Sequence, residues 1–181
     1  MAITPKIKYG FTLASGPDNL KSYPEGSSQR FHKGDLVKLS ANKVVSMGSA
    51  NPYTANSTTV ESGIMGVAAR DGKNATTNAD CDVYVICQEQ TWEAHVQAGK
   101  KPSTATKLQQ GDGCKLAFKA ATNYTISNGT TTTTTTVAAW YVKSTANTGT
   151  KGVRIVKHIP EEEGIKGGKV LVRFLSAAAQ E

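Results

Sequence analysis

The sequence predicts an all-β protein, either a single β-barrel or a sandwich-like domain with long polar loops and an N-terminal extended arm. The pattern Gly-Asp-x-x-Lys-Leu occurs twice, at residues 34–39 and 111–116, and Gly and Asp favour a turn that begins a strand. Thr, Asn, Gly, Ala and Ser fill much of the chain, whereas amphipathic helical runs are scarce. The 181 residues fit one domain, expected over residues 30–181.

The N-terminal segment, residues 1–29, is expected to be an arm or a first strand. Four apolar residues alternate there with polar or small ones, which is typical of a strand with one apolar face: Ile7, Tyr9, Phe11 and Leu13. Residues 16–28 are rich in helix and strand breakers, which predicts a flexible segment after this strand. Two alternatives carry equal weight. The four residues contact another subunit, or they form the first strand of the chain's own barrel.

Each Gly-Asp turn is followed by further strand candidates in the same order. They are residues 43–47 and 63–69 after the first turn, and residues 123–126 and 137–142 after the second. The chain therefore reads as two loosely similar runs of strands.

The remaining segments also favour strands. Residues 82–97 are predicted to form one long bulged strand, in preference to a strand followed by a helix. Asn128-Gly129 predicts a hairpin, and the Thr tract at 130–136 predicts a solvent-facing strand or hairpin arm. Two last strands are expected at 152–159 and 168–175. The only helix candidates are short, at 160–163 and 176–181.

Composition excludes several classes of protein. The net charge is +7, but the basic residues are scattered, which indicates a mildly basic soluble protein without a specific nucleic-acid partner. No apolar run approaches the ~18 residues that span a bilayer, so no membrane partner is expected. Three cysteines do not make a disulfide framework, which indicates synthesis in a reducing cytoplasm.

Candidate catalytic and metal-ligating residues are isolated from one another. His32, His95 and His158 fall in separate strand candidates without metal-ligand spacing, and no Cys-x-x-Cys, nucleophile elbow or phosphate loop occurs. We therefore expect no catalytic residue, no metal and no cofactor. The large aromatic residues lie in alternating apolar segments, which is typical of core positions rather than of base-stacking surfaces: Trp92, Trp140, Tyr141 and Phe174.

One family resemblance rests on the order of four short motifs. They are Phe31-x-Lys33-Gly34-Asp35-Leu36-Val37, then Gly63-Ile64-Met65-Gly66-Val67-Ala68, then Asp82-Val83-Tyr84-Val85, then Gly111-Asp112. This order resembles the capsid decoration, or cement, proteins of tailed bacteriophages over roughly residues 30–118. Residues 123–181 show no motif of that family.

The resemblance implies a structural virion protein on the outer surface of a phage head. Its partners would be the major capsid protein and copies of itself, with a trimer as the default. Two rival readings remain: a tail, fibre or nucleic-acid-binding module, and a β-barrel enzyme without a recognisable signature.

Overall fold

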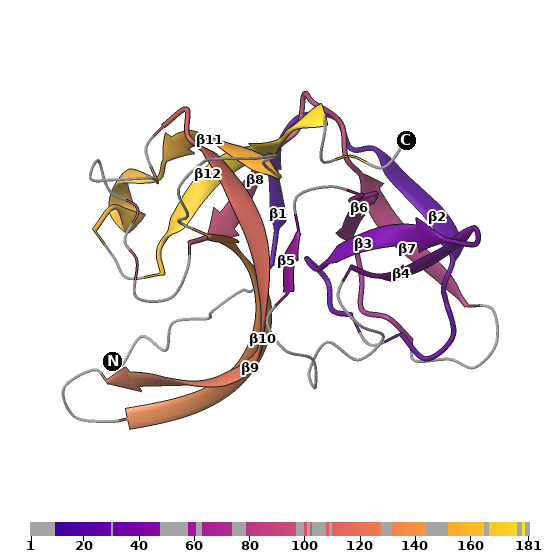
Figure 1. Cartoon of the computed structure of the whole chain (residues 1–181), viewed down its shortest axis with the longest axis horizontal. Coiled ribbons are helices and arrows are strands. Elements are labelled where there is room, and N and C mark those ends of the chain that lie inside the picture. Colours follow the sequence, from indigo (N-terminus) through magenta and orange to yellow (C-terminus); the bar gives the residue numbers. More distant parts are fainter. Residues whose placement is uncertain are drawn as a thin grey trace.

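The computed structural model describes residues 10–29, 31–47, 58–60, 63–73, 79–96, 100, 102, 108, 110–127, 132–143, 152–164, 167–176 and 179. Within these residues the regular structure is β-strand, apart from a single turn of 3₁₀-helix at Pro160–Glu162. The predicted all-β class is confirmed. The strands pair antiparallel in two sheets, one of five strands and one of seven (Figure 1).

The five-stranded sheet, here called the first unit, has the order β2-β7-β6-β3-β4. Its strands are β2 (Leu20–Pro24), β3 (Leu36–Ser40), β4 (Lys43–Ser46), β6 (Gly66–Ala68) and β7 (Asp80–Val85). A single parallel bridge between Glu25 and Val44 joins the end of β2 to β4. The sheet therefore curls round on itself without forming a continuous barrel ladder.

The second unit repeats this plan with the order β8-β12-β11-β9-β10. Its strands are β8 (Thr91–His95), β9 (Gly113–Ser127), β10 (Thr132–Lys143), β11 (Val153–His158) and β12 (Lys169–Phe174). A parallel bridge between Val96 and Val142 corresponds to the bridge of the first unit. Two more strands enlarge the sheet: β1 (Thr12–Ser15) pairs with β8, and β5 (Thr58–Val60) pairs with β9.

The repeated Gly-Asp sequence is one structural device used twice. Gly34 and Gly111 have φ values of +93° and +92°, which glycine adopts without strain. The Gly34 N–H donates to the Ala68 carbonyl (2.8 Å), and the Ala68 N–H donates to the carbonyl of Asp35 (2.9 Å). In the second copy, the Gly111 N–H donates to the Ile155 carbonyl (2.8 Å), and the Ile155 N–H donates to the Asp112 carbonyl (2.9 Å). Two residues opposite one, with a left-handed glycine first, make a G1 β-bulge at the start of β3 and of β9.

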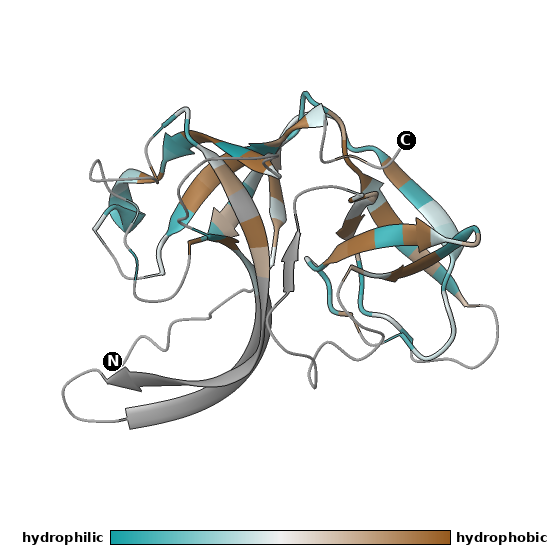
Figure 2. Ribbon diagram, viewed as in Figure 1, coloured by the Kyte–Doolittle hydropathy of each residue, from teal (hydrophilic) through white to brown (hydrophobic). Residues whose placement is uncertain are grey.

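Equivalent positions line the interiors of both units. The small core of the first unit comprises Phe31, Val37, Val44, Met65, Ala68, Cys81 and Val83. Strand register matches Val37 to Cys114, which is buried inside the second unit together with Trp92 and Trp140. Apolar residues follow the strands of both units, and hydrophilic residues gather at many of the turns (Figure 2). The prediction that Cys114 and the two tryptophans are core residues is confirmed.

The outer faces of the two units differ. Leu36 and Val67, on the outer face of the first unit, belong to the large core that fills the second unit. The first unit therefore packs its outer face against the second, and its strands are buried on both sides. This accounts for the continuous apolar runs at 36–37 and 64–68, because a strand buried on both faces does not alternate.

The units also differ in the equivalent hairpins that join β3 to β4 and β9 to β10. In the first unit, β3 and β4 are joined by Ala41 and Asn42, with φ values of +48° and +61°, as in a type I′ turn. In the second unit, β9 and β10 continue to the pair Ser127–Thr132 and curve away from the body of the molecule (Figure 1). We call residues 119–127 and 132–139 the ribbon.

Three expectations were wrong. Residues 82–97 form two strands in different sheets, because the chain turns between β7 and β8. The Gln90 side chain, fully buried, accepts from the Cys87 N–H and donates to the Pro17 carbonyl, both at 3.0 Å, and so fixes that turn. The breaker-rich stretch 16–28 contains β2. Residues 123–126 are part of β9 rather than a separate strand.

Candidate functional site

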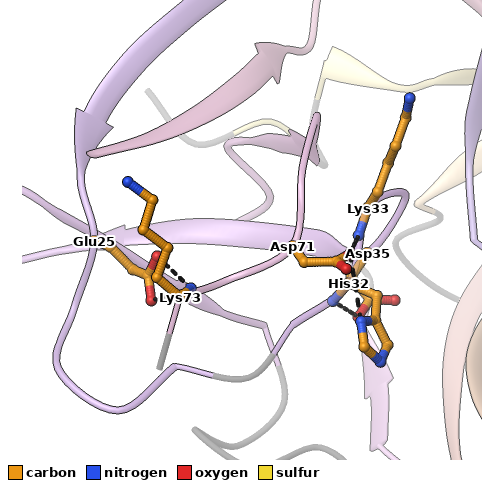
Figure 3. A network of polar contacts seen from close by, with 6 residues as sticks. All are labelled: Glu25, His32, Lys33, Asp35, Asp71 and Lys73. Carbon is orange, nitrogen blue, oxygen red and sulfur yellow. Dashed lines mark hydrogen bonds and ion pairs between the residues drawn. The ribbon is translucent and has the colours of Figure 1, made fainter. Parts of the chain in front are cut away.

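A polar network surrounds the first Gly-Asp turn and joins it to the segment that follows β6 (Figure 3). The Asp35 side chain accepts a hydrogen bond from the His32 backbone N–H (2.8 Å), while the Asp35 N–H donates to the His32 carbonyl (3.0 Å). The two bonds close the turn in both directions. Asp35 is 6% exposed, so its carboxylate is shielded from water.

A second carboxylate holds the same turn from outside. Asp71 Oδ1 accepts the Lys33 backbone N–H at 2.7 Å and lies 3.4 Å from the Nδ1 atom of His32. The side chains of His32 and Asp71 are 57% and 66% exposed. Solvent therefore screens this ion pair, and its contribution to stability is small.

A third carboxylate anchors the same segment from the end of β2. Glu25 is 3% exposed, and both of its carboxylate oxygens lie 3.0 Å from the backbone nitrogen of Lys73. The Glu25 N–H donates to the Ala79 carbonyl at 2.6 Å. No sequence pattern predicted this role, because Pro24-Glu25-Gly26 has only the composition of a turn.

The network suits a structural task. Each of its three carboxylates accepts from a backbone N–H, which positions loops rather than presenting an unpaired base. Burial raises the pKa of the Asp35 carboxyl from 3.8 to about 6, against the lowering effects of the His32 hydrogen bond and the His32 charge. The nearby Asp71 charge adds to the rise. The arrangement ties β3 to the segment after β6.

The other two histidines are engaged by backbone carbonyls. His95 Nδ1 lies 2.8 Å from the Gly167 carbonyl oxygen, and His158 Nε2 lies 2.6 Å from that of Leu108. His158 Nδ1 is also 3.6 Å from Glu163. A carbonyl can only accept, so His158 Nε2 must donate its proton there. His158, paired with Glu163 through its other ring nitrogen, therefore holds Leu108 beside β11.

The cysteines and aromatic side chains offer no assembled site in the described part of the chain. Burial, and next the charge of Glu25, raise the pKa of the Cys81 thiol to about 12, which makes it a poor nucleophile. Trp92, Trp140 and Phe174 are at most 3% exposed, so they are not available to stack on bases. Among the described residues, no group of three His, Cys, Asp or Glu side chains is placed to hold a metal. No helix among these residues has the length and apolar character needed to span a bilayer.

Of the four residues predicted to form a subunit interface, the structure describes only Phe11 and Leu13. Phe11 is 3% exposed, its ring lies 5.2 Å from that of Phe174, and its N–H donates to the Gly34 carbonyl. Leu13 pairs with Trp92 in the sheet and packs partly against the core. Phe11 therefore faces the chain's own core rather than another subunit. Ile7 and Tyr9 lie outside the described residues, and the contact expected of them stays a prediction.

The outer face of the second unit carries a pair of arginines that sequence reasoning missed. Arg154 on β11 and Arg173 on β12 are directly opposite each other, and both are exposed. Their neighbours Val153, Ile155, Val172 and Phe174 are buried, so both arginines lie on the outer face. Like charges directly opposite each other in a sheet are unfavourable. The alternation in each strand was visible in the sequence, but the register that aligns the arginines was not.

Comparison with known proteins identifies no relative: no family model, no curated protein and no solved structure matches the chain.

Proposed function

We propose that the protein is a structural virion protein that binds the outside of a phage head, contacts the major capsid protein and stabilises the shell. The proposal rests on the motif order that resembles capsid decoration proteins. It involves no catalytic step, and it places the protein on the outer capsid surface after synthesis in the host cytoplasm.

The observation that carries the proposal is how the resembling motifs assemble. The Gly34-Asp35 bulge holds Ala68, β6 pairs with both β3 and β7, and so the first three motifs form one curled antiparallel sheet. The fourth motif begins the same bulge in the second unit. The order of the motifs thus corresponds to a β-unit that occurs twice in the chain. This supports the proposed structural role and argues against a chance similarity of short sequence motifs.

The surface that we assign to the capsid is the outer face of the second unit. The equivalent face of the first unit is covered by the second unit, as the burial of Val67 shows. Arg154 occupies the position in the second unit that Val67 occupies in the first, and it is exposed. Within the described residues, Arg154 and Arg173 form no ion pair, although Arg173 Nε donates to Thr91 Oγ1 at 3.3 Å. A carboxylate-bearing partner would relieve the repulsion between the two guanidinium groups.

The experiment is binding to phage heads that lack their decoration protein. Purified protein is mixed with expanded heads, the particles are sedimented, and the bound protein is counted per particle. We expect saturable binding to a fixed number of copies and greater resistance of the heads to heat. Arg154→Glu/Arg173→Glu should weaken binding by at least about tenfold, because it reverses two contacts with an acidic surface.

The matched control is Lys21→Glu/Lys33→Glu, which reverses the same number of charges on exposed side chains of the first unit. It should bind heads like the unaltered protein. Absence of the protein from purified particles, together with no binding to undecorated heads, would refute the proposed function. Equal weakening by both double variants would show that net charge, rather than the outer face of the second unit, drives binding.

A further inference from the structure

The ribbon has strand edges with no neighbour in the described part of the chain. The outer edge of β10 meets β8 only through the Val96–Val142 bridge, and no described strand pairs with it from 132 to 139. On the opposite edge, β9 pairs with β11 and β5 only up to Phe118. An isolated two-stranded hairpin is marginal in water, so a further strand paired with the ribbon would stabilise it.

Comparison of the two units shows that the ribbon is an addition to a fold that is complete without it. The pair Leu39–Val44 in the first unit is equivalent to Leu116–Val142 in the second, because each valine makes the parallel bridge of its unit. The first unit turns back after one more pair. The second continues to Ser127–Thr132 before it turns. The extra length therefore contributes nothing to closure of the unit.

The sequence of the ribbon indicates what it pairs with. Residues 120–142 carry no charged side chain, although the chain as a whole has a net charge of +7. Exposed edge strands are usually protected by Lys, Pro or a bulge, but residues 132–136 are all Thr. An acidic partner would be met by basic residues. An uncharged edge instead lets two copies of a basic protein approach without opposing like charges.

We propose that the outer edge of β10 pairs antiparallel with the same strand of a second copy of this chain, about a twofold axis near Thr134. Antiparallel pairing of two identical strands is self-complementary. It places Thr133 opposite the second copy's Thr135, and each position from 132 to 136 meets another Thr. Opposed Thr residues are a favourable cross-strand pair. The result is a sheet continuous across two molecules, and it does not depend on the proposed role on a phage head.

The test compares the mass of the full chain in solution with that of two variants, by light scattering across a dilution series. In the first, residues 120–138 are replaced by Ala-Asn, the turn that closes the first unit. Lys119–Ala139 then becomes the last pair before the turn. It lies two pairs beyond the equivalent of Ser40–Lys43, so the turn meets the same side of the strand ladder as in the first unit. In the second, Thr133→Lys/Thr135→Lys sets Lys opposite Lys across the axis, and it should raise the dimer dissociation constant at least about tenfold.

The control, Leu20→Lys/Ser22→Lys, adds the same charges to exposed positions of β2. We expect a dimer for the full chain and for this control, a monomer for the shortened variant, and slow hydrogen exchange at residues 132–139 only in the dimer. If the shortened variant does not fold, the Thr133→Lys/Thr135→Lys result decides. A full chain that stays monomeric, a trimer, or a lysine variant that dimerises like the control would overturn the proposal.

Discussion

The buried carboxyl of Asp35 makes the stability of the protein depend on pH in a predictable direction. Its pKa is about 6 in the folded chain, against 3.8 for an ordinary aspartate, because burial disfavours the charged form. Between these values the folded state binds the proton more tightly than the unfolded state does. The stabilisation is therefore fully present below about pH 3.8, and it is lost as the pH rises through about 6.

The size of the effect follows from that shift. A difference of about two pKa units corresponds to about 3 kcal/mol in the free energy of unfolding. Asp35→Asn removes the ionisation but keeps a side-chain oxygen that can accept from the His32 N–H. The free energy of unfolding of the variant, minus that of the unaltered protein, should therefore become about 3 kcal/mol more positive between about pH 3 and pH 7.

The measurement is chemical denaturation of both proteins at a series of pH values, with the difference taken at each pH so that other titrating groups cancel. Asp18→Asn serves as the control, because it removes an exposed carboxylate that is not among the groups acting on Asp35. Water screens an exposed charge, so this substitution should change the free energy of unfolding far less than Asp35→Asn does. A flat difference for Asp35→Asn, or one that falls as the pH rises, would refute the argument.

Three other predictions concern single positions. Gly111→Ala should cost about 1–2 kcal/mol of stability, from the left-handed backbone alone, because no heavy atom lies within 4 Å of the added Cβ. Gly10→Ala should cost more in the same thermal unfolding assay, since its Cβ would lie 2.5 Å from the Gly34 carbonyl oxygen, and an equal loss for both would contradict this. Gln90→Ala should cost about 2 kcal/mol or more by leaving two hydrogen-bonding groups unpaired, while the exposed Glu89→Ala should be near neutral in denaturant titration. A thiol reagent should label the half-buried Cys87 in the native protein and reach Cys81 and Cys114 only after unfolding; rapid native labelling of Cys81 would count against its burial.

Local sequence signals predicted the parts of the fold that depend on local chemistry. The Gly-Asp repeat located both bulges, since only glycine adopts their φ value readily. Asn128-Gly129 predicted the pairing of β9 with β10, and the last two strands fall within the ranges expected for them. Each of these depends on residues close together in the chain.

Features set by distant contacts were not predictable in the same way. The run from 82 to 97 contains no Gly or Pro, and the turn within it is held by Gln90 through a residue far away in sequence, Pro17. The alternation from Ile7 to Leu13 predicted a strand with one apolar face but not what would cover it. For Phe11 the answer is Phe174, near the other end of the chain. The three carboxylates of the turn network likewise act on backbone groups that periodicity does not reveal.

The position of β1 has a consequence for how the chain reaches its native state. β1 precedes the whole first unit in the sequence, yet it pairs with β8 at the edge of the second unit. During synthesis β1 is made early, and it can pair only after β8 has been made. Such pairing across a long separation slows folding, because the ordering of the intervening chain comes before the contact. The first strand thus links the two units. If the chain were cut between them, the N-terminal fragment would contain β1 but not its partner strand β8.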